Sequence, residues 1–139
     1  KCEQGLMPLA AYEDLSSFKL YFSDTGLFNS RLQLTKQSLA AARQYMGALT
    51  ENYVAIQLKA NGYKLNYWTS TATAEVDFVI VQNGEVVPIE CKANIHVKSK
   101  SLDSFVKRYG IKQSIRLSMR NFGFENNIKS VPLYAVFCV

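Results

Sequence analysis

The stretch EVDFVIVQNGEVVPIECK, residues 75–92, decides the fold of this chain. It holds two apolar runs, Val76–Val81 and Val86–Cys91, on either side of Gln82-Asn83-Gly84-Glu85. An Asn-Gly pair between apolar runs favours a two-residue type I′ turn, because both central residues of that turn need a positive φ. The stretch therefore predicts a β-hairpin in which Gln82 faces Glu85.

The register of this hairpin places charged residues opposite one another. Asp77 faces Glu90, and Glu75 faces Lys92, while strict alternation sends three apolar residues to the other face: Val76, Phe78 and Ile80. Asp77 and Glu90 form a non-hydrogen-bonded pair, whose Cα atoms lie only about 4.5 Å apart. Carboxylates that close repel unless a cation or proton lies between them, and Mg²⁺ takes such oxygen ligands. The other interpretation is a solvent-facing hairpin with an ordinary Glu75–Lys92 salt bridge.

A long amphipathic pattern from about Lys36 to Asn61 predicts a helix that ends at Gly62 as a C-cap. Its apolar positions recur at steps of three and four residues: Leu39, Ala42, Met46, Leu49, Tyr53, Ile56 and Ala60. Glu51 falls nearly opposite this stripe, yet its helical neighbours are small or apolar: Gly47, Val54, Ala55 and Leu58. Either Glu51 is buried with a partner, or the helix is covered on both sides.

Weaker patterns supply the remaining elements. Asp24 is a candidate helix cap, and an apolar stripe closed by Gly110 predicts a helix over Leu102–Tyr109. Further strands are expected at Phe18–Phe22, Tyr63–Trp68, Ser114–Ser118 and Pro132–Val139. The order β, α, βββ, α, ββ indicates an α/β (α+β) fold in which helices flank a mixed sheet.

Composition and cysteine usage exclude several classes of protein. The chain has 139 residues, of which 48% are hydrophobic, as in one ordinary globular domain. No apolar run approaches the roughly 18 residues of a membrane helix, so no membrane partner is expected. Three cysteines without metal-ligand spacing and a single His96 argue against a zinc site and favour a reducing cytoplasm. The chain carries no phosphate-binding loop motif.

The net charge of +5 is unevenly distributed along the chain. Residues 1–97 carry 8 basic and 9 acidic side chains, whereas residues 98–139 carry 8 basic and 2 acidic ones. The candidate phosphate-binding residues are Lys98, Lys100, Lys107, Arg108, Lys112, Arg116 and Arg120. They could contact nucleic acid, or they could equally form the solvated side of the second helix and its neighbour.

The helical Glu51, then Asp77, then Glu90-Cys91-Lys92 resembles the motif of the PD-(D/E)XK nuclease superfamily. More closely, the chain resembles the DUF4143 family, the C-terminal domain of a group of AAA+-type ATPases. The matching stretches are Phe18–Tyr21, Asp24–Leu27, Gly47–Val54, Tyr67-Trp68, Glu75–Ile80 and Val87–Lys92. The resemblance implies a restriction-endonuclease-like αβββαβ core over residues 36–139. Residues 1–35 would be a lead-in from an upstream ATPase part, consistent with a chain that begins at Lys1 as a fragment.

The resemblance also implies roles for individual residues. Asp77 and Glu90 would bind Mg²⁺ or Mn²⁺, with the Cys91 carbonyl as a further ligand and Glu51 completing the site. Lys92, with a pKa lowered beside the metal, would orient water or stabilise developing charge. The first hypothesis is a Mg²⁺-dependent nuclease of DNA or RNA. The second is a non-catalytic module that binds nucleic acid or a partner and regulates the ATPase.

Overall fold

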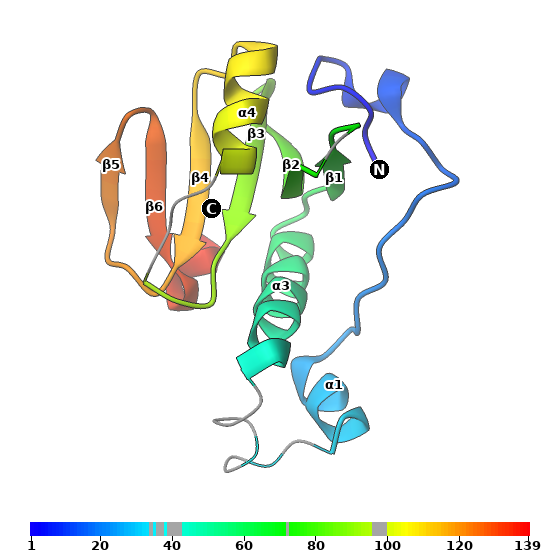
Figure 1. The fold of residues 1–139 in the computed structure, drawn as a ribbon, viewed down its shortest axis with the longest axis vertical. Coiled ribbons are helices and arrows are strands. Elements are labelled where there is room, and N and C mark those ends of the chain that lie inside the picture. Colours follow the sequence, from blue (N-terminus) through cyan, green and yellow to red (C-terminus); the bar gives the residue numbers. More distant parts are fainter. Residues whose placement is uncertain (34, 36–37, 39–42, 72, 96–99) are drawn as a thin grey trace.

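The computed structural model describes residues 1–33, 35, 38, 43–71, 73–95 and 100–139 (Figure 1). The elements are η1 (Leu9–Tyr12), α1 (Thr25–Arg31), α3 (Arg43–Ala60), β1 (Asn66–Thr69), β2 (Glu75–Gln82), β3 (Glu85–Cys91), α4 (Lys100–Tyr109), β4 (Ser114–Ser118), β5 (Gly123–Glu125), β6 (Ile128–Pro132) and η2 (Leu133–Cys138). The expected domain boundary at residue 36 and the residues Leu39, Ala42, His96 and Lys98 lie outside the described part. Among the described helices, none is both long and apolar enough to cross a membrane.

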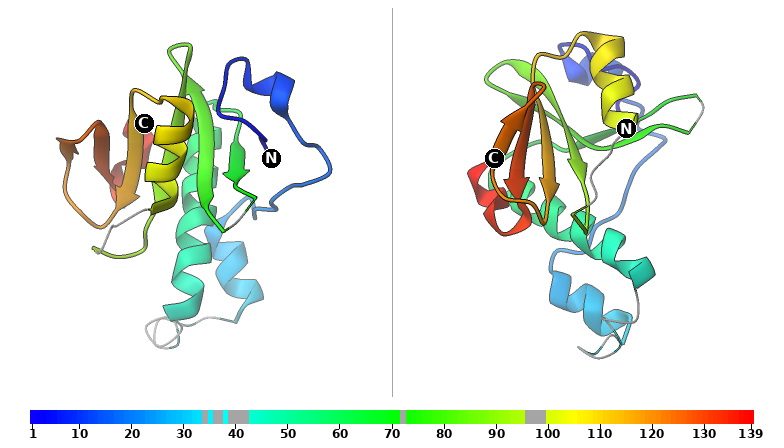
Figure 2. Two further views of the ribbon diagram at one scale, coloured as in Figure 1. Left: turned by 45° about the horizontal axis from the view of Figure 1, so that its top comes forward. Right: turned by 60° about the vertical axis from the view of Figure 1, so that its left-hand side comes forward.

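The strands form one mixed sheet in the order β1-β2-β3-β4-β6-β5. The strands β1, β2 and β3 are antiparallel, β3, β4 and β6 are parallel, and β5 returns antiparallel to β6. This arrangement confirms the expected α+β class, in which helices flank a mixed sheet. Helices flank this sheet (Figure 2), and two apolar clusters join them to it. One joins α3 and η2 to the sheet, and the other joins α4 and the N-terminal segment to it.

The hairpin from β2 to β3 has the predicted turn and register. Asn83 and Gly84 adopt positive φ angles of 52° and 76°, as a type I′ turn requires. Gln82 pairs with Glu85, and the ladder continues in the same register to Phe78. The turn residues therefore fix which side chains of the two strands meet.

A β-bulge interrupts β2 next to Asp77. In the pairing of β2 with β1, Asp77 and Phe78 together oppose Tyr67 alone. The flanking pairs are Asn66 with Val79 and Trp68 with Val76. An extra residue of this kind twists the strand and redirects a side chain.

The bulge corrects the expected alternation. Val76 packs in the cluster of α4, whereas Phe78 and Ile80 pack in the cluster of α3. The prediction that these three residues share one face is therefore wrong, because the bulge shifts the alternation by one residue at Asp77.

The long helix is present, but it buries a different face from the predicted stripe. The fully buried apolar residues of α3 in the sheet-facing cluster are Val54, Ala55 and Leu58. These are the helical neighbours of Glu51, whereas Ala60 of the predicted stripe is exposed. Leu49 is also buried, so both explanations offered for Glu51 apply: it has partners, and the helix is covered on more than one side.

The segment Phe18–Phe22 is not a strand. Apolar and polar residues do alternate along it, but the apolar side chains are the ones that point to solvent: Phe18 and Leu20 are 70% and 86% exposed. The polar groups of Lys19 and Tyr21 contact Glu51 of α3 instead. Asn52 replaces a neighbouring strand: its Oδ1 accepts from the Phe22 N–H at 2.8 Å, and its Nδ2 donates to the Phe22 carbonyl at 3.3 Å. A side chain thus anchors this segment.

The prediction for the C-terminal residues is also wrong. Leu133–Cys138 form the 3₁₀-helix η2, Pro132 is the last residue of β6, and β6 is the strand that pairs with β4. The sequence reasoning missed the β5–β6 hairpin, which turns at Asn126 and Asn127 with φ angles of 51° and 60°. Two adjacent asparagines tolerate positive φ, so this was the signal available.

The smaller predictions are mostly confirmed. The Asp24 side chain caps α1 by accepting from the Leu27 N–H at 2.9 Å. Gly62 and Gly110 have φ angles of +87° and +64° just beyond the ends of α3 and α4, where a helix C-cap needs them. The strand Ser114–Ser118 is found as predicted, whereas the strand expected at Tyr63–Trp68 begins only at Asn66.

The α3 face gives a direct test of this fold. Leu58→Ala removes a completely buried side chain, so the free energy of unfolding should fall by about 2–5 kcal/mol. Leu20→Ala makes the same chemical change at an exposed site and should alter it by less than about 0.5 kcal/mol. Urea unfolding of both variants measures the difference. A comparable loss in Leu20→Ala would show that residues 18–22 are packed as a strand after all.

Candidate functional site

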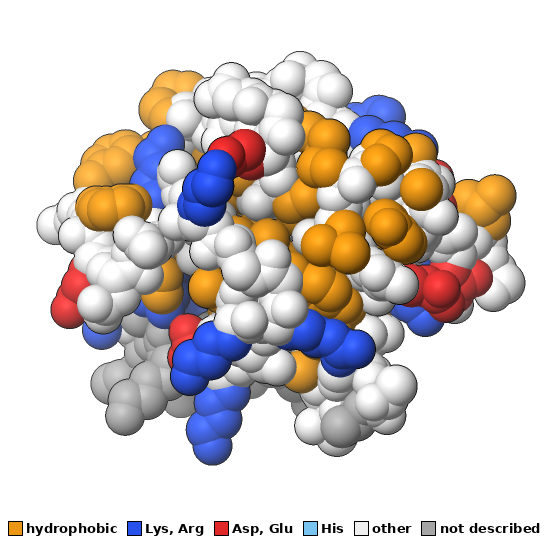
Figure 3. All heavy atoms as spheres, turned by 90° about the horizontal axis from the view of Figure 1, so that it is seen from above, with side chains coloured by type: hydrophobic (Ala, Val, Ile, Leu, Met, Phe, Trp, Pro, Cys, Tyr) orange, Lys and Arg blue, Asp and Glu red, His pale blue; other side chains and the backbone are white. Residues whose placement is uncertain are grey.

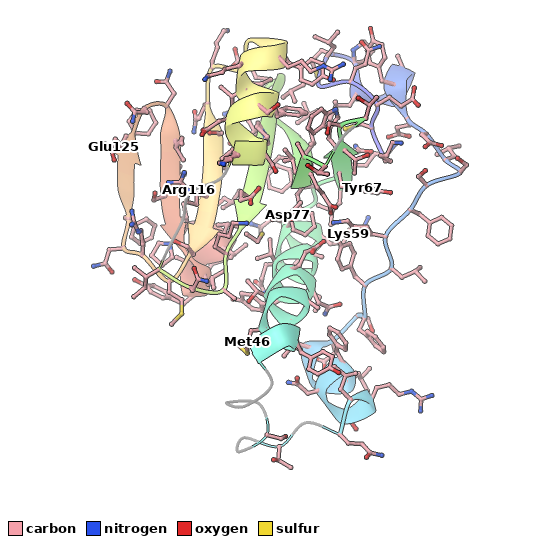
Figure 4. All side chains as sticks on the ribbon, in the orientation of Figure 1. Met46, Lys59, Tyr67, Asp77, Arg116 and Glu125 are labelled. Atoms are coloured by element: carbon pink, nitrogen blue, oxygen red, sulfur yellow. The ribbon has the colours of Figure 1, made fainter. Side chains whose placement is uncertain are left out.

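Asp77 lies at the bulge of β2 (Figure 4). Its Oδ2 accepts the backbone N–H of Cys91 at 2.7 Å, so the carboxylate ties β2 to the end of β3. Burial, followed by the charge of Glu90 and a smaller effect of Glu51, raises the pKa of Asp77 from 3.8 to about 7. Asp77 therefore exchanges a proton near neutral pH, as a buried carboxyl near a second carboxylate does. The predicted pairing of Asp77 with Glu90 lies beyond the β2–β3 ladder, which ends at Phe78 and Ile89.

Glu90 is the most buried acid of the site, with an exposed fraction of 3%. Its Oε1 forms an ion pair with the Lys92 Nζ at 2.5 Å, whereas its Oε2 is buried without a hydrogen-bond partner among the described residues. Arg116 lies beside Glu90 in the β3–β4 register, and its Nε is likewise buried and unpartnered. A buried oxygen without a donor is costly and marks a position where a cation fits.

Lys92 follows β3 directly, and its backbone N–H donates to the Leu117 carbonyl at 2.8 Å. Burial alone would lower the pKa of its ammonium, but the hydrogen bond and charge of Glu90, with the charge of Asp77, raise it above the ordinary value. The resemblance had implied a lowered pKa for Lys92 beside a bound metal ion, whereas the protein groups by themselves raise this pKa. Among the protein groups, Lys92 is a firmly protonated donor.

Glu51 projects from α3 and is held by two groups that sequence reasoning missed. The Lys19 Nζ contacts its Oε1 at 2.8 Å, and the Tyr21 hydroxyl donates to the same oxygen at 2.7 Å. Burial and the hydrogen bond to Glu51 raise the pKa of the Tyr21 phenol, which therefore stays protonated. The available signal was the Lys-x-Tyr spacing, which puts both polar groups on one side of an extended segment.

Glu75 is not the partner of Lys92. Its carboxylate forms an ion pair with Lys19, so Lys19 bridges an acid of α3 and an acid of β2. The salt bridge expected from the hairpin register is therefore wrong, because Lys92 turns to Glu90 on its own strand instead.

The acids of the site offer carboxylate oxygens, which are ligands that Mg²⁺ prefers. Within the described ranges, no three His, Cys, Asp or Glu side chains gather closely enough to hold a metal ion together. Mg²⁺ in proteins commonly uses only one or two carboxylates together with water. Asp77 and the unpartnered Oε2 of Glu90 are oxygen donors of that kind. The residues present therefore fit the ion through this pair of acids.

Two aromatic residues of β1 lie near the site. Trp68 is a core residue: it is 1% exposed and donates from Nε1 to the Tyr109 hydroxyl at 3.1 Å. Tyr67, labelled in Figure 4, is partly buried, and its ring lies 5.1 Å from the Lys19 ammonium. Neither residue presents a free stacking platform. Cys91 packs partly against the α3 cluster, and burial raises its thiol pKa well above 9.0, so it is no thiolate ligand.

On the face seen in Figure 3, Lys and Arg side chains appear as separate groups with hydrophobic side chains between them. Several basic residues of the last third have local contacts. Lys112 pairs with Glu85, Arg120 donates to the Ile95 carbonyl at 2.9 Å, and Arg108 lies 5.6 Å from the ring of Tyr109.

The Asp77–Glu90 pair makes stability and titration depend on pH. Because the folded state raises the pKa of Asp77, this group favours folding below about pH 4, and its contribution is lost as the pH rises to about 7. Asp77→Asn keeps an oxygen for the Cys91 N–H, so it should remove this slope and be more stable than the wild type at pH 8, on the order of 4 kcal/mol.

Carboxyl NMR titration separates the causes of this shift. In Glu90→Gln the pKa of Asp77 should fall by about one, because a neighbouring negative charge is gone. An Asp77 that titrates near 4 in the wild type would contradict the burial and charge arrangement described.

Comparison with known protein families identifies the family of this chain. The family model described as "Domain of unknown function (DUF4143)" matches residues 46–136, which is more than half of the chain. The match runs from α3 through most of η2 and includes Glu51, Asp77, Glu90 and Lys92. No curated protein and no solved structure matches the chain at a significant level. The extent of the family match is decisive: the chain belongs to the DUF4143 family.

Proposed function

We propose that this chain is a nuclease-like domain that cleaves phosphodiester bonds of nucleic acid with the help of Mg²⁺ or Mn²⁺. The observation that carries the proposal is the buried Glu90, whose Oε2 has no partner in the described part of the chain and whose charge acts on Asp77 of the adjacent strand. The order α3, β1, β2, β3, α4, β4 around this pair is the αβββαβ order of the PD-(D/E)XK superfamily, which the chain resembles.

The residues of the chain would divide the work according to charge. Asp77 and Glu90 would hold the cation, with the Cys91 carbonyl beside them and Glu51 at the edge of the site. When bound, the ion supplies Lewis acidity: it lowers the pKa of coordinated water and offsets negative charge on the phosphate. Lys92 is protonated, so it would donate to a phosphate oxygen and not accept a proton from water.

The family resemblance extends the proposal to the parent protein. The domain would be the C-terminal part of an AAA+-type ATPase and would meet the ATPase part of the same chain as its partner. The three cysteines Cys2, Cys91 and Cys138 are free, which supports a reducing cytoplasmic setting.

One observation favours the alternative, a non-catalytic module that binds nucleic acid or a partner protein and regulates the ATPase. Each carboxylate that projects into the site already has a partner from the chain itself: Lys92 for Glu90, Lys19 for Glu51, and the Cys91 N–H for Asp77. The assay below separates the two functions.

Cleavage of labelled DNA and RNA should require the acidic pair and its lysine. With Mg²⁺ or Mn²⁺ present, Asp77→Asn and Lys92→Met should each lower the rate by at least about 100-fold, the usual effect of losing one electrostatic group at a reacting phosphate or carbonyl. Time courses on single-stranded and duplex substrates measure the rates.

The matched control is Lys64→Met, which removes an exposed lysine that pairs with Glu13 away from the site. It should cleave like the wild type. Equal cleavage by wild type, Asp77→Asn and Lys92→Met would overturn the catalytic assignment and indicate a contaminant. Salt-dependent binding without any cleavage would favour the regulatory module.

A further inference from the structure

Residues 18–22 run as an extended segment beside the rest of the molecule, between η1 and α1 (Figure 1). We call them the strap. Its Lys19 ammonium reaches the acidic side of the site, where it contacts Glu51 at 2.8 Å and also pairs with Glu75. Its charge further favours the ionised form of Asp77. A protein cation thus lies among three acids of the site.

We propose that Lys19 is an internal counter-ion that competes with a divalent cation, so that the strap must leave α3 before Glu51 can take part in metal binding. The proposal rests on the function proposed above, because Glu51 and Asp77 belong to the metal site proposed there. It adds a control element: the strap position sets how tightly the site holds a metal ion.

The strap is attached in a way that allows it to leave. In the described part of the chain, the backbone of residues 18–22 makes no hydrogen bond to another backbone group. The attachments are made by side chains: Asn52 on Phe22, Glu51 with Lys19 and Tyr21, Glu75 with Lys19, and the ring of Tyr21 on Phe78 with 5.8 Å between the centroids. Segments held by a few partly exposed contacts are those that open at low free-energy cost.

Two solvent-open pockets border the strap. One, of about 190 Å³, lies between the strap and the sheet and is lined by Lys19, Tyr21, Tyr67 and Asp77. The other, of about 260 Å³, lies between the strap and α3 beside Glu51. A hydrated cation could therefore approach the contacts of Lys19 from either side of the strap.

Lys19 forms ion pairs with Glu51 and Glu75, and all three side chains are partly exposed to solvent. The side chains of Lys19 and Glu51 are 23% and 25% exposed, and that of Glu75 is 46% exposed. Ion pairs with this exposure contribute little net stability. A divalent ion carries twice the charge of the Lys19 ammonium. Unlike Lys19, it can bind the carboxylates without the strap being held against α3.

Mn²⁺ binding to the complete chain, measured by isothermal titration calorimetry, tests the proposal. Lys19→Met removes the competing charge and should tighten Mn²⁺ binding about 10-fold. Tyr21→Phe removes only the hydroxyl on Glu51 and should tighten it by a smaller factor without a change of charge. Lys64→Met, which removes a lysine of another ion pair, should leave the affinity unchanged.

A second measurement follows the strap itself. Mg²⁺ should increase hydrogen exchange of a peptide that spans residues 18–23, because the Phe22 N–H loses its bond to Asn52 when the strap leaves. If Asp77→Asn abolishes Mn²⁺ binding while Lys19→Met binds no tighter than wild type, the counter-ion role is overturned and the metal site stands. If wild type and Lys19→Met both bind no Mn²⁺, the metal site and the strap proposal fail together.

Discussion

The register of the β2–β3 hairpin is the constraint on which the rest of this structure depends. Two turn residues with positive φ, Asn83 and Gly84, set the register, and the ladder carries it to Phe78 and Ile89. A slip by one residue would turn every side chain of one strand to the opposite face. The bulge then adds a local adjustment at Asp77, next to which the apolar residues of β2 divide between the two clusters.

Two neighbouring buried acids oppose folding, and the structure offsets this in several ways. Glu90 keeps Lys92 on one oxygen, Glu51 keeps Lys19 and Tyr21, and Asp77 has a pKa near neutrality, so it can be neutral at little cost. Each device is local and reversible. The site thus balances the charge of its acids with a proton and two lysines, and a buried acid left without such a partner would cost several kcal/mol.

Local patterns predicted the parts of the fold that local chemistry determines. The Asn-Gly turn, the Asp24 cap and the glycines that end both long helices each follow from the conformational needs of one residue. The strap and the choice of buried face on α3 did not follow, because Phe18–Phe22 has the alternation of a strand but meets a helix with its polar side. The bulge at Asp77 depends on Tyr67 of β1, so no pattern within β2 alone could reveal it. The site residues were predictable individually, whereas the capture of Glu51 and Glu75 by Lys19 is a tertiary contact.

Several of the basic residues in the last third of the sequence already have partners within the fold. Lys112, Arg108 and Arg120 are engaged with Glu85, an aromatic ring and a backbone carbonyl. Arg116 differs, because it lies beside Glu90 in the sheet and has a buried Nε without a partner in the described residues. The excess of six positive charges in the last third therefore does not act as one unit. What distinguishes Arg116 is its position: it is a cation built into the sheet, directly beside Glu90 and with one strand between it and Asp77, where charge acts at short range and with little screening.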